Sequence, residues 1–463
     1  MMASWLRRPA QLARLALRPV SAEKRQLLEE RWQELPDGLR TDNQVVGRQL
    51  AHCGYTMGAA YCSFSCTHCY LPRNANRTPL PTLAEMKEQI DANRRLLGEN
   101  GALQITGGDV LDAYWKADRI DELVEILRYA AEASTVPMLM THGQVLLDQP
   151  HVFERLVGEG GLRKLAIHID ITQAGRPEYP LKRLRRESDL HPLRQRFVEA
   201  IEAVREKTGC AVSAAHTVTV TEANADSIAD ILEWLLEDGR RLRAFRMISL
   251  QTEADVGRTR MSDEAVHADD VWQTVAETAG LDLLKDAFLF GHSDCSRQAL
   301  VARLGRGGPL VDLLPEGEPT RRVVARTLGI FGGVGTRGND GLAANVQRLS
   351  LLARSPSFLL DVVRHIEHVR RSAGLSRRRF LPGALRALRE TTILNVVQHN
   401  FMDSATVQSG CASVNERLQA CSFRGAVQRN GVWEAVPMCE VNAGAREQLY
   451  SLAIESRTRA EAN

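Results

Sequence analysis

The segment YCSFSCTHCY, residues 61–70, places Cys62, Cys66 and Cys69 at C-x3-C-x2-C spacing directly after a predicted strand at residues 54–60. Cysteine thiolates hold iron–sulfur clusters, and three of them on a four-iron cube leave one iron open. An open coordination position on a metal is where a substrate or cosubstrate binds. A zinc site is the alternative, but zinc wants a fourth ligand, and His68 is directly adjacent to Cys69. The segment therefore predicts a four-iron cluster with one free iron position.

Outward from this segment, short β-rich runs alternate with amphipathic helical ones up to about residue 280. Strands are predicted at residues 54–60, 103–106, 137–141, 165–169, 211–219 and 245–249. Helices are predicted at residues 83–97, 119–133, 150–157, 192–207, 224–236 and 263–279. Six β/α units in series predict an α/β fold whose parallel sheet curls toward a partial barrel. In such barrels the chemistry collects at the carboxyl ends of the strands.

The cysteine triplet, its place after the first strand and the six β/α units together resemble the radical S-adenosylmethionine (SAM) superfamily over roughly residues 50–280. This resemblance implies a [4Fe-4S] cluster whose open iron is chelated by the amino and carboxylate groups of SAM. One electron then cleaves SAM to methionine and a 5′-deoxyadenosyl radical, which abstracts hydrogen from an unactivated C–H bond. It further implies a flavodoxin- or ferredoxin-like reducing partner.

Gly107, Gly108 and Asp109 follow the second predicted strand and are similar to the Gly-Gly-Glu segment of that superfamily, which contacts the SAM amino group. Glycines let the backbone approach a ligand closely, and a carboxylate can accept from an ammonium group. The alternative is a plain strand-to-helix turn with Asp109 as its cap. Polar residues also end the third and fourth strands, where either a ligand contact or a structural hydrogen bond is expected: Thr141, His142, His168 and Asp170.

The remaining cysteines predict a second cluster. The chain has nine cysteines, of which the triplet accounts for three, and Cys53 and Cys210 stand alone as expected buried thiols. The four that remain are Cys295, Cys411, Cys421 and Cys439. Four thiolates complete a fully ligated cube, suited to electron transfer or to holding another group. Unrelated buried cysteines are the alternative.

The C-terminal segments HNFMD (residues 399–403), ERLQAC (416–421) and VPMCEVN (436–442) are similar to the end of one radical SAM branch, which includes the tetraether (macrocyclic archaeol) lipid synthases. That resemblance implies an auxiliary [4Fe-4S] cluster and C–C bond formation on a lipid-like substrate. The stretch from Arg321 to Arg389, which holds fourteen arginines and no lysine, departs from the pattern of that branch.

Composition limits the class of protein. With 44% hydrophobic and 25% charged residues in 463, the chain is globular rather than disordered, collagenous or stapled by disulfides. The longest uncharged run, residues 49–72, holds four cysteines and is a poor membrane span. Clustered cysteines in odd number indicate a reducing cytoplasm. The arginine-rich stretch and a basic amphipathic pattern in the first 22 residues predict an anionic partner, for which a membrane surface at the inner face or a lipid is favoured.

We therefore expect four regions: a basic helical N-terminal segment (1–48), a radical SAM partial barrel (49–283), an arginine-rich helical region (284–390) and an auxiliary-cluster region (391–463). The expected activity is hydrogen abstraction on a lipid-like substrate. A peptide- or protein-modifying maturase is the first alternative, and a non-catalytic iron–sulfur protein is the second. Nucleic acid is disfavoured because aromatic residues make up only 5% of the chain, too few for a base-stacking surface.

Overall fold

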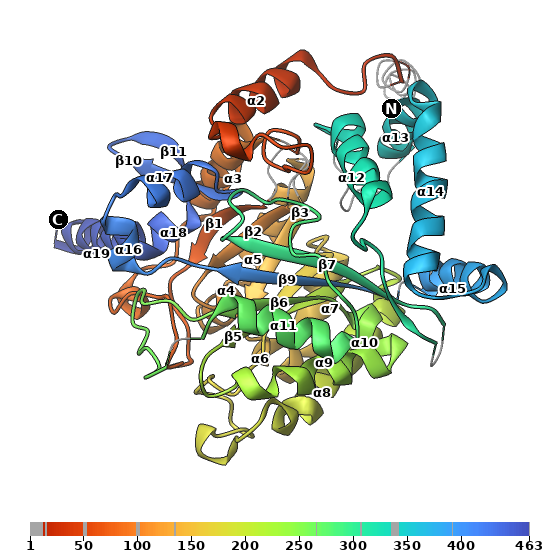
Figure 1. The fold of residues 1–463 in the computed structure, drawn as a ribbon. Coiled ribbons are helices and arrows are strands. Elements are labelled where there is room, and N and C mark those ends of the chain that lie inside the picture. Colours follow the sequence, from red (N-terminus) through yellow and green to blue (C-terminus); the bar gives the residue numbers. More distant parts are fainter. Residues whose placement is uncertain are drawn as a thin grey trace.

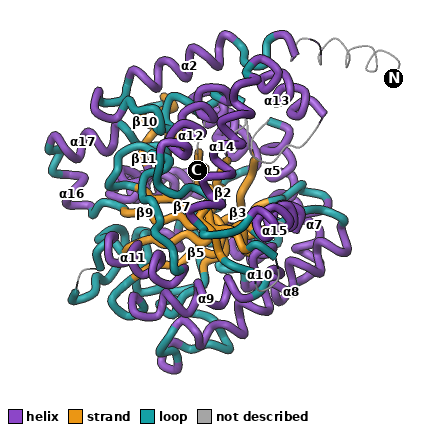
Figure 2. The backbone as a smooth tube through the Cα atoms, turned by 45° about the vertical axis from the view of Figure 1, so that its right-hand side comes forward, coloured by secondary structure: helices purple, strands orange, loops and turns teal. Residues whose placement is uncertain are grey.

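The computed structural model describes Ala13 and residues 16–462, apart from residues 50–52, 99–101, 134–135, 265, 306–307, 335–341 and 391. Most of the basic pattern expected in the first 22 residues lies outside this part of the chain. Strands occupy the centre of the molecule and helices surround them (Figures 1 and 2). Within the described residues no helix has the length and apolar character needed to cross a bilayer.

Six parallel strands form the first part of the sheet, and they lie where the sequence predicts them. They are β1 (Cys53–Ala59), β2 (Ala102–Gly107), β3 (Val136–Thr141), β4 (Lys164–His168), β5 (Ser213–Val220) and β6 (Phe245–Thr252). Each pairs in parallel with the next along the chain. A mostly parallel α/β sheet thereby confirms the predicted fold class.

Helices connect these strands and cover the outer face of the sheet. They are α3 (Leu83–Leu97), α4 (Val110–Lys116), α5 (Ile120–Glu132), α6 (Gln144–Asp148), α7 (Pro150–Gly158), α8 (His191–Thr208), α9 (Ile228–Glu237), α10 (Gly239–Ala244) and α11 (Ala268–Ala279). Local sequence fixes their starts: Thr82 and Glu85 form a reciprocal capping box at the first turn of α3. Their apolar faces join the strands in one large buried cluster, which supplies most of the hydrophobic stabilisation of the barrel.

The sheet continues with strands from beyond residue 284. These are β7 (Ser296–Arg303), β8 (Leu310–Asp312), β9 (Ile393–Asn400), β10 (Phe423–Arg429) and β11 (Val432–Pro437). The resulting eleven-stranded order is β11-β10-β1-β2-β3-β4-β5-β6-β9-β7-β8. β9 pairs in parallel with β6 and β10 in parallel with β1, so C-terminal residues extend both edges of the barrel. The β/α repeats of the sequence end near residue 280. Beyond that point the strands join the sheet by pairing with strands that are distant in the sequence.

Helices account for the rest of the described chain. The arginine-rich stretch forms α12 (Glu318–Phe331), α13 (Leu342–Arg354), α14 (Pro356–Ser372) and α15 (Arg377–Glu390). The earlier part of the region expected to be helical, 284–390, instead contains strands β7 and β8. Helix α2 (Ala22–Gln33) precedes the sheet. Near the C-terminus lie α16 (Ser404–Gln408), α17 (Ala412–Gln419), α18 (Met438–Glu440) and α19 (Arg446–Ala462). α12 packs on α14 at one side of the molecule, and α16 to α19 gather at the opposite side (Figure 1).

Candidate functional site

The cysteine-bearing loop leaves the carboxyl end of β1 and is held from two sides. The amide of Ser63 donates to Asp112 Oδ2 at 2.8 Å, which ties the loop to α4. The amide of Arg258 donates to the carbonyl oxygen of Cys69 at 3.0 Å, which ties the loop to the segment after β6. The loop is therefore fixed at the end of the barrel where the sequence predicts the chemistry.

Phe64 anchors the middle of this loop. Its side chain is buried and its ring stacks on His142, with ring centroids 3.8 Å apart and an angle of 3° between the planes. Gly175 allows this position, because a Cβ atom there would lie 2.5 Å from the Phe64 ring. The guanidinium of Arg176 lies 5.3 Å from the same ring. Phe64 thus packs the loop against His142 after β3 and against the segment that follows β4.

The three thiols of the loop form one partly buried group. Burial raises the pKa of Cys62, and the negative charges of Asp109, Cys66 and Cys69 add to the effect. Burial and the neighbouring Cys69 and Asp170 raise the pKa of Cys66 to about 12. Like charges at short range disfavour ionisation, and a bound metal cluster reverses that preference. A set of three soft sulfur donors fits a [4Fe-4S] cluster with one open iron.

Gly107 and Gly108 bring the end of β2 into close contact with the start of the cysteine loop. A Cβ atom on Gly107 would lie 1.9 Å from the carbonyl oxygen of Ala59, and one on Gly108 would lie 2.1 Å from the carbonyl oxygen of Tyr61. Gly107 also has a φ of 128°, which side-chain-bearing residues rarely adopt. Both glycines are thus required by the backbone itself, and their contact with SAM stays a prediction.

Asp109 has the capping role that was the alternative for it. Its Oδ1 accepts from the amide of Asp112 at 2.8 Å and caps α4, while its Oδ2 accepts from the Thr141 hydroxyl at 2.8 Å. The amide of His142 donates to Oδ2 at 2.5 Å. These donors join β2 to the end of β3 beneath the cysteine loop. The structure gives Asp109 a structural function, and a further role toward SAM stays a prediction.

One group of side chains near the loop has the composition of a single-metal site. Ligand atoms of Cys62, Asp112 and His142 all lie within 4.8 Å of one another. Sulfur, nitrogen and oxygen donors of this kind suit zinc. Such an ion would leave Cys66 and Cys69 without a role, whereas a cube uses all three cysteines. His68, the weak zinc candidate in the sequence, instead pairs through Nδ1 with Glu253 at 2.8 Å.

The predicted polar residues at the end of β4 form a buried hydrogen-bonded group. His168 Nε2 lies 2.7 Å from Asp170 Oδ2, and the amide of Thr219 donates to the same oxygen at 2.9 Å. These bonds and the charge on His168 hold the pKa of Asp170 well below its usual value despite burial. The side chain of His168 is 33% exposed, so it is reachable from solvent, whereas Asp170 is not. The structural role expected for Asp170 is thus satisfied within the protein.

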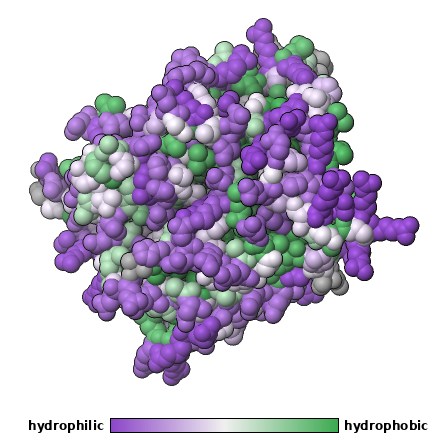
Figure 3. Space-filling view, viewed as in Figure 1, coloured by the Kyte–Doolittle hydropathy of each residue, from purple (hydrophilic) through white to green (hydrophobic). Residues whose placement is uncertain are grey.

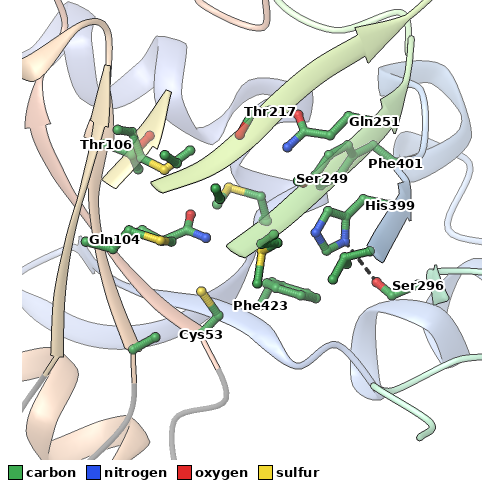
Figure 4. Close-up of a pocket in the computed structure, with 18 of the residues that line it drawn as sticks. Cys53, Gln104, Thr106, Thr217, Ser249, Gln251, Ser296, His399, Phe401 and Phe423 are labelled. Carbon is green, nitrogen blue, oxygen red and sulfur yellow. Dashed lines mark hydrogen bonds between the residues drawn. The ribbon is translucent and has the colours of Figure 1, made fainter. Parts of the chain in front are cut away.

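The concave face of the sheet encloses a cavity of about 710 Å³. Its lining includes inward-facing residues of β1 to β7 and β9, and His68 and Tyr70 of the cysteine loop open onto it. Polar side chains from several strands point into it, and Ser296 hydrogen-bonds to His399 Nδ1 at 3.0 Å (Figure 4). Burial lowers the pKa of His399 to about 4, so this ring is neutral at physiological pH. The cavity places a substrate-sized space next to the cysteines.

The sequence contains a signal for this cavity that the prediction did not use. In β5, Ser213, Ala215, Thr217 and Thr219 alternate with larger or apolar residues, and these four line the cavity. In β9, Asn395, Val397 and His399 do the same. A strand whose every second residue is small or polar faces a hydrated space rather than a packed core. That alternation could have identified the inner face of the barrel.

Three of the four cysteines expected in the second cluster come together. Burial raises the pKa of Cys421 and of Cys439, and the charge of Cys295 adds to both effects. Arg417 Nε donates to Cys295 Sγ at 3.5 Å. The three thiols therefore share one partly buried site at the junction of β7, β10 and α18. Each cysteine has a close neighbour in the chain that lines the cavity. These neighbours are Ser296 after Cys295, Phe423 two residues after Cys421, and Met438 before Cys439.

Cys411, the fourth expected ligand, differs from the other three because it is exposed. It caps α17, is exposed, and its Sγ lies 3.4 Å from the hydroxyl of Ser413. Hydrogen bonds from Ser413 and from the amide of Val414 lower its pKa to about 7. No interaction with the other three cysteines is found for it within the described residues. The wide spacing of the four cysteines in the sequence did not indicate this difference.

Residues 59–235 match the family model described as Radical SAM superfamily. This segment contains all three loop cysteines as well as Gly107, Gly108 and Asp109. Residues 59–235 therefore form a radical SAM domain, which confirms for this part of the chain the superfamily expected from the sequence. The narrower resemblance to the branch of tetraether lipid synthases stays a prediction.

Solved structures give only distant matches. SuiB of Streptococcus suis matches with 12% identity and a TM-score of 0.36, over 52% of this chain and 49% of SuiB, so the chain spans about half the length of that protein. Methylornithine synthase (PylB) matches with 16% identity and a TM-score of 0.34, over 56% and 69%. The FeFe-hydrogenase maturase HydG of Carboxydothermus hydrogenoformans matches with 11% identity and a TM-score of 0.36, over 79% and 80%. A search of the curated proteins gave no match. The family assignment therefore rests on residues 59–235.

Proposed function

We propose that the chain abstracts a hydrogen atom from an unactivated C–H bond of a substrate bound in the barrel cavity. The observation that carries this proposal is that His68 and Tyr70, the two neighbours of Cys69 in the loop, line a cavity of about 710 Å³. Cys62, Cys66 and Cys69 would hold the [4Fe-4S] cluster, which together with SAM supplies the one-electron chemistry for this step. Radical chemistry requires that water be kept from the reacting atoms, and the buried Phe64 ring beside the loop would contribute to this.

A lipid-like chain is the substrate class we favour, with C–C bond formation as the expected reaction. Four methionines line the cavity: Met138, Met140, Met247 and Met438. Methionine side chains are flexible and polarisable, so they pack against aliphatic chains of variable shape. Phe290, Phe401 and Phe423 add apolar surface on the side formed by the C-terminal strands.

A peptide substrate is the second candidate, and the polar inner positions favour it. Gln104, Thr217, Ser249, Gln251 and Asn395 also line the cavity (Figure 4). Amide and hydroxyl side chains can pair with the amides of an extended peptide. We therefore propose parallel screens of reconstituted protein with isoprenoid lipids and with peptides. Formation of 5′-deoxyadenosine that is stimulated by one class and not by the other assigns the substrate.

The first test of the proposal is metal content after anaerobic reconstitution. In a variant with Cys62, Cys66 and Cys69 all changed to alanine, we expect a loss of about four irons per chain and of SAM cleavage. Zinc binding at Cys62, Asp112 and His142 would overturn the proposal: the protein would then hold about one zinc and lack this iron. Cys210→Ala is the matched control, because this cysteine lies far along the chain at the start of β5 and should not alter the iron content.

We further propose that Cys295, Cys421 and Cys439 hold an auxiliary [4Fe-4S] cluster at the wall of the cavity. Their proximity to one another and to Phe423 and Met438 supports this proposal. Changing these three cysteines to alanine should remove about four irons while the loop cluster is retained. Cys411→Ala should keep all of the iron. Loss of iron in that variant would instead assign Cys411 as the fourth ligand, as the sequence predicts.

An anionic membrane surface is the partner we propose for the side formed by α14 and α15. Leu359, Leu360 and Val363 form an apolar stripe on α14, exposed at 54%, 59% and 62%. Hydrophilic and hydrophobic side chains lie close together along this edge of the molecule (Figure 3). Exposed arginines surround the stripe on α14 and α15: Arg364, Arg371, Arg377, Arg378 and Arg379. Each basic residue near an anionic lipid surface contributes about 1 kcal/mol to binding.

Sedimentation with lipid vesicles tests this partner. We expect retention on phosphatidylglycerol vesicles, release by salt, and little binding to phosphatidylcholine vesicles. A variant with Leu359, Leu360 and Val363 changed to serine should bind less, whereas Leu452→Ser, at an equally exposed position of α19, should bind like the wild type. The proposal would be contradicted if the protein bound both kinds of vesicle equally and the α14 variant bound as well as the wild type. A flavodoxin- or ferredoxin-like protein remains the proposed source of electrons.

A further inference from the structure

A buried arginine from the C-terminal region faces the barrel cavity. Arg446, the first residue of α19, is 1% exposed and forms part of the cavity lining together with Asn442. Its guanidinium lies 4.7 Å from the centre of the Tyr70 ring, and Tyr70 directly follows the last cysteine of the loop. Arg446 therefore lies between the substrate space and the cysteine loop, although 377 residues separate it from Cys69 (446 − 69).

The hydrogen bonds of Arg446 are incomplete. Nη2 donates to Asn442 Oδ1 at 2.9 Å, while Nε and Nη1 are buried without a hydrogen-bond partner. The hydroxyl of Tyr450 lies close enough to interact with the same guanidinium. An arginine presents its donors as a planar fork that matches a carboxylate or phosphate. The Nε and Nη1 atoms of Arg446 are therefore available to donate to a bound group.

The protein supplies no carboxylate to balance this charge among the described residues. The groups that interact electrostatically with Arg446 are the phenols of Tyr450, Tyr70 and Tyr55. The acidic residue of the cavity lining, Glu253, instead pairs with His68. Burial of an unpaired charge is unfavourable, so a ligand that brings a negative group to Arg446 would remove this cost.

The backbone before Arg446 is shaped to place this side chain. Gly444 has a φ of 150° and a non-helical conformation, so the chain kinks between Val441 and Arg446. Here the kink lets Asn442 and Arg446 both face the cavity from one short segment.

We propose that Arg446, assisted by Asn442 and Tyr450, binds the anionic group of the substrate, a carboxylate or a phosphate. The assignment to the substrate rests on the proposed function, because the remainder of the molecule would occupy the cavity. The anionic end would be held beside Tyr70, and the apolar end would extend among the methionines of β3 and β6. Positioning by one charged pair fixes which carbon of a flexible substrate lies at the reacting end.

Melting temperatures of the reconstituted protein test anion binding without a turnover assay. Phosphate and acetate serve as probes against sodium chloride at matched ionic strength. In the wild type we expect one probe to raise the melting temperature by about 2 °C, and the larger rise identifies phosphate or carboxylate as the group bound. Arg446→Gln should abolish the rise and Arg446→Lys should reduce it. Arg429→Gln, which removes an arginine paired with Glu440 at the surface, should keep it.

Two results would overturn the proposal: no rise with either probe in the wild type, or an equal rise in Arg446→Gln. SAM binding supplies the second arm. Arg446→Gln should bind SAM within twofold of the wild type, whereas a tenfold weaker affinity would show that Arg446 holds the carboxylate of SAM instead. Failure of the proposed function would give a different result. The wild type would then lack iron or SAM cleavage, but its melting temperature would still rise with the anion.

Discussion

At the scale of single residues, Asp312 at the end of β8 is a buried carboxyl with one unsatisfied oxygen. Burial raises its pKa to about 6, and Asp282 adds to the effect. The folded state therefore holds this proton more tightly than the unfolded chain, so the stabilisation is complete below the unfolded pKa and is lost as the pH rises through about 6. We predict that Asp312→Asn raises the free energy of unfolding at pH 7.5 by on the order of 2 kcal/mol and has little effect below about pH 4.

Urea unfolding at several pH values measures this difference. Asp226→Asn, at an exposed site, is the control and should leave the free energy of unfolding within about 0.5 kcal/mol at each pH. A gain for Asp312→Asn that is the same at low and neutral pH would contradict the assignment to titration of Asp312.

The exposed thiol of Cys411 is the subject of a second prediction at this scale. Its pKa is lowered to about 7, first by the Ser413 hydroxyl, and the thiol is exposed. Reactive cysteines combine a low pKa with access to solvent. We predict that iodoacetamide modifies Cys411 before the other eight cysteines at pH 7, as followed by peptide mass spectrometry. Ser413→Ala should slow this reaction. Protection of Cys411 on cluster reconstitution would instead indicate that it becomes an iron ligand.

At the scale of elements, β10 joins the C-terminal region to the strand that carries the cysteine loop. Gly425 of β10 faces Tyr55 of β1, and a Cβ atom there would lie 2.3 Å from the Tyr55 ring. Tyr55 cannot move easily, because it is buried and its hydroxyl donates to the carbonyl of Val436 at 2.9 Å. We predict that Gly425→Ala lowers the free energy of unfolding by about 1–3 kcal/mol, measured by urea unfolding, and lowers iron retention.

For a glycine in an open environment we expect the opposite effect of alanine on the free energy of unfolding. Gly329 lies inside α12 and a Cβ atom there would meet nothing within 4 Å. Gly329→Ala should therefore raise the free energy of unfolding by about 0.5–1 kcal/mol through helix propensity. If both substitutions changed stability in the same direction, the close fit of β10 against β1 would be wrong.

At the scale of the whole molecule, one sheet connects residues 53 to 437. β7 reaches the barrel only through β9, and β9 pairs with β6 through residues 393–400. We predict that a chain ending at residue 390 loses cooperative thermal unfolding, since β7 and β8 would lose their partner and the cavity would open to water. Circular dichroism during heating measures this, with a chain ending at Ser451 as the control, which retains every strand. A cooperative melt of the shorter chain would show that the barrel at 49–283 folds alone.

The sequence by itself determined the six β/α units and the cysteine loop. Both are local features, because strand and helix periodicity extends over about 10–15 residues and the three thiols lie within eight positions, from Cys62 to Cys69. The contact of Gly107 and Gly108 with the start of this loop is visible only in the folded chain, and their contact with SAM stays a prediction.

The tertiary structure alone decided how the C-terminal third completes the site. The pairings of β9 with β6 and of β10 with β1 join residues more than 100 positions apart, and no local pattern specifies such partners. The same packing gathers Cys295, Cys421 and Cys439 while Cys411 is exposed, and it turns Arg446 into the cavity. Charge and cysteine content indicate that a chain can bind an anion or a cluster. Only the three-dimensional arrangement determines which side chains do so, because desolvation and proximity arise when distant segments pack together.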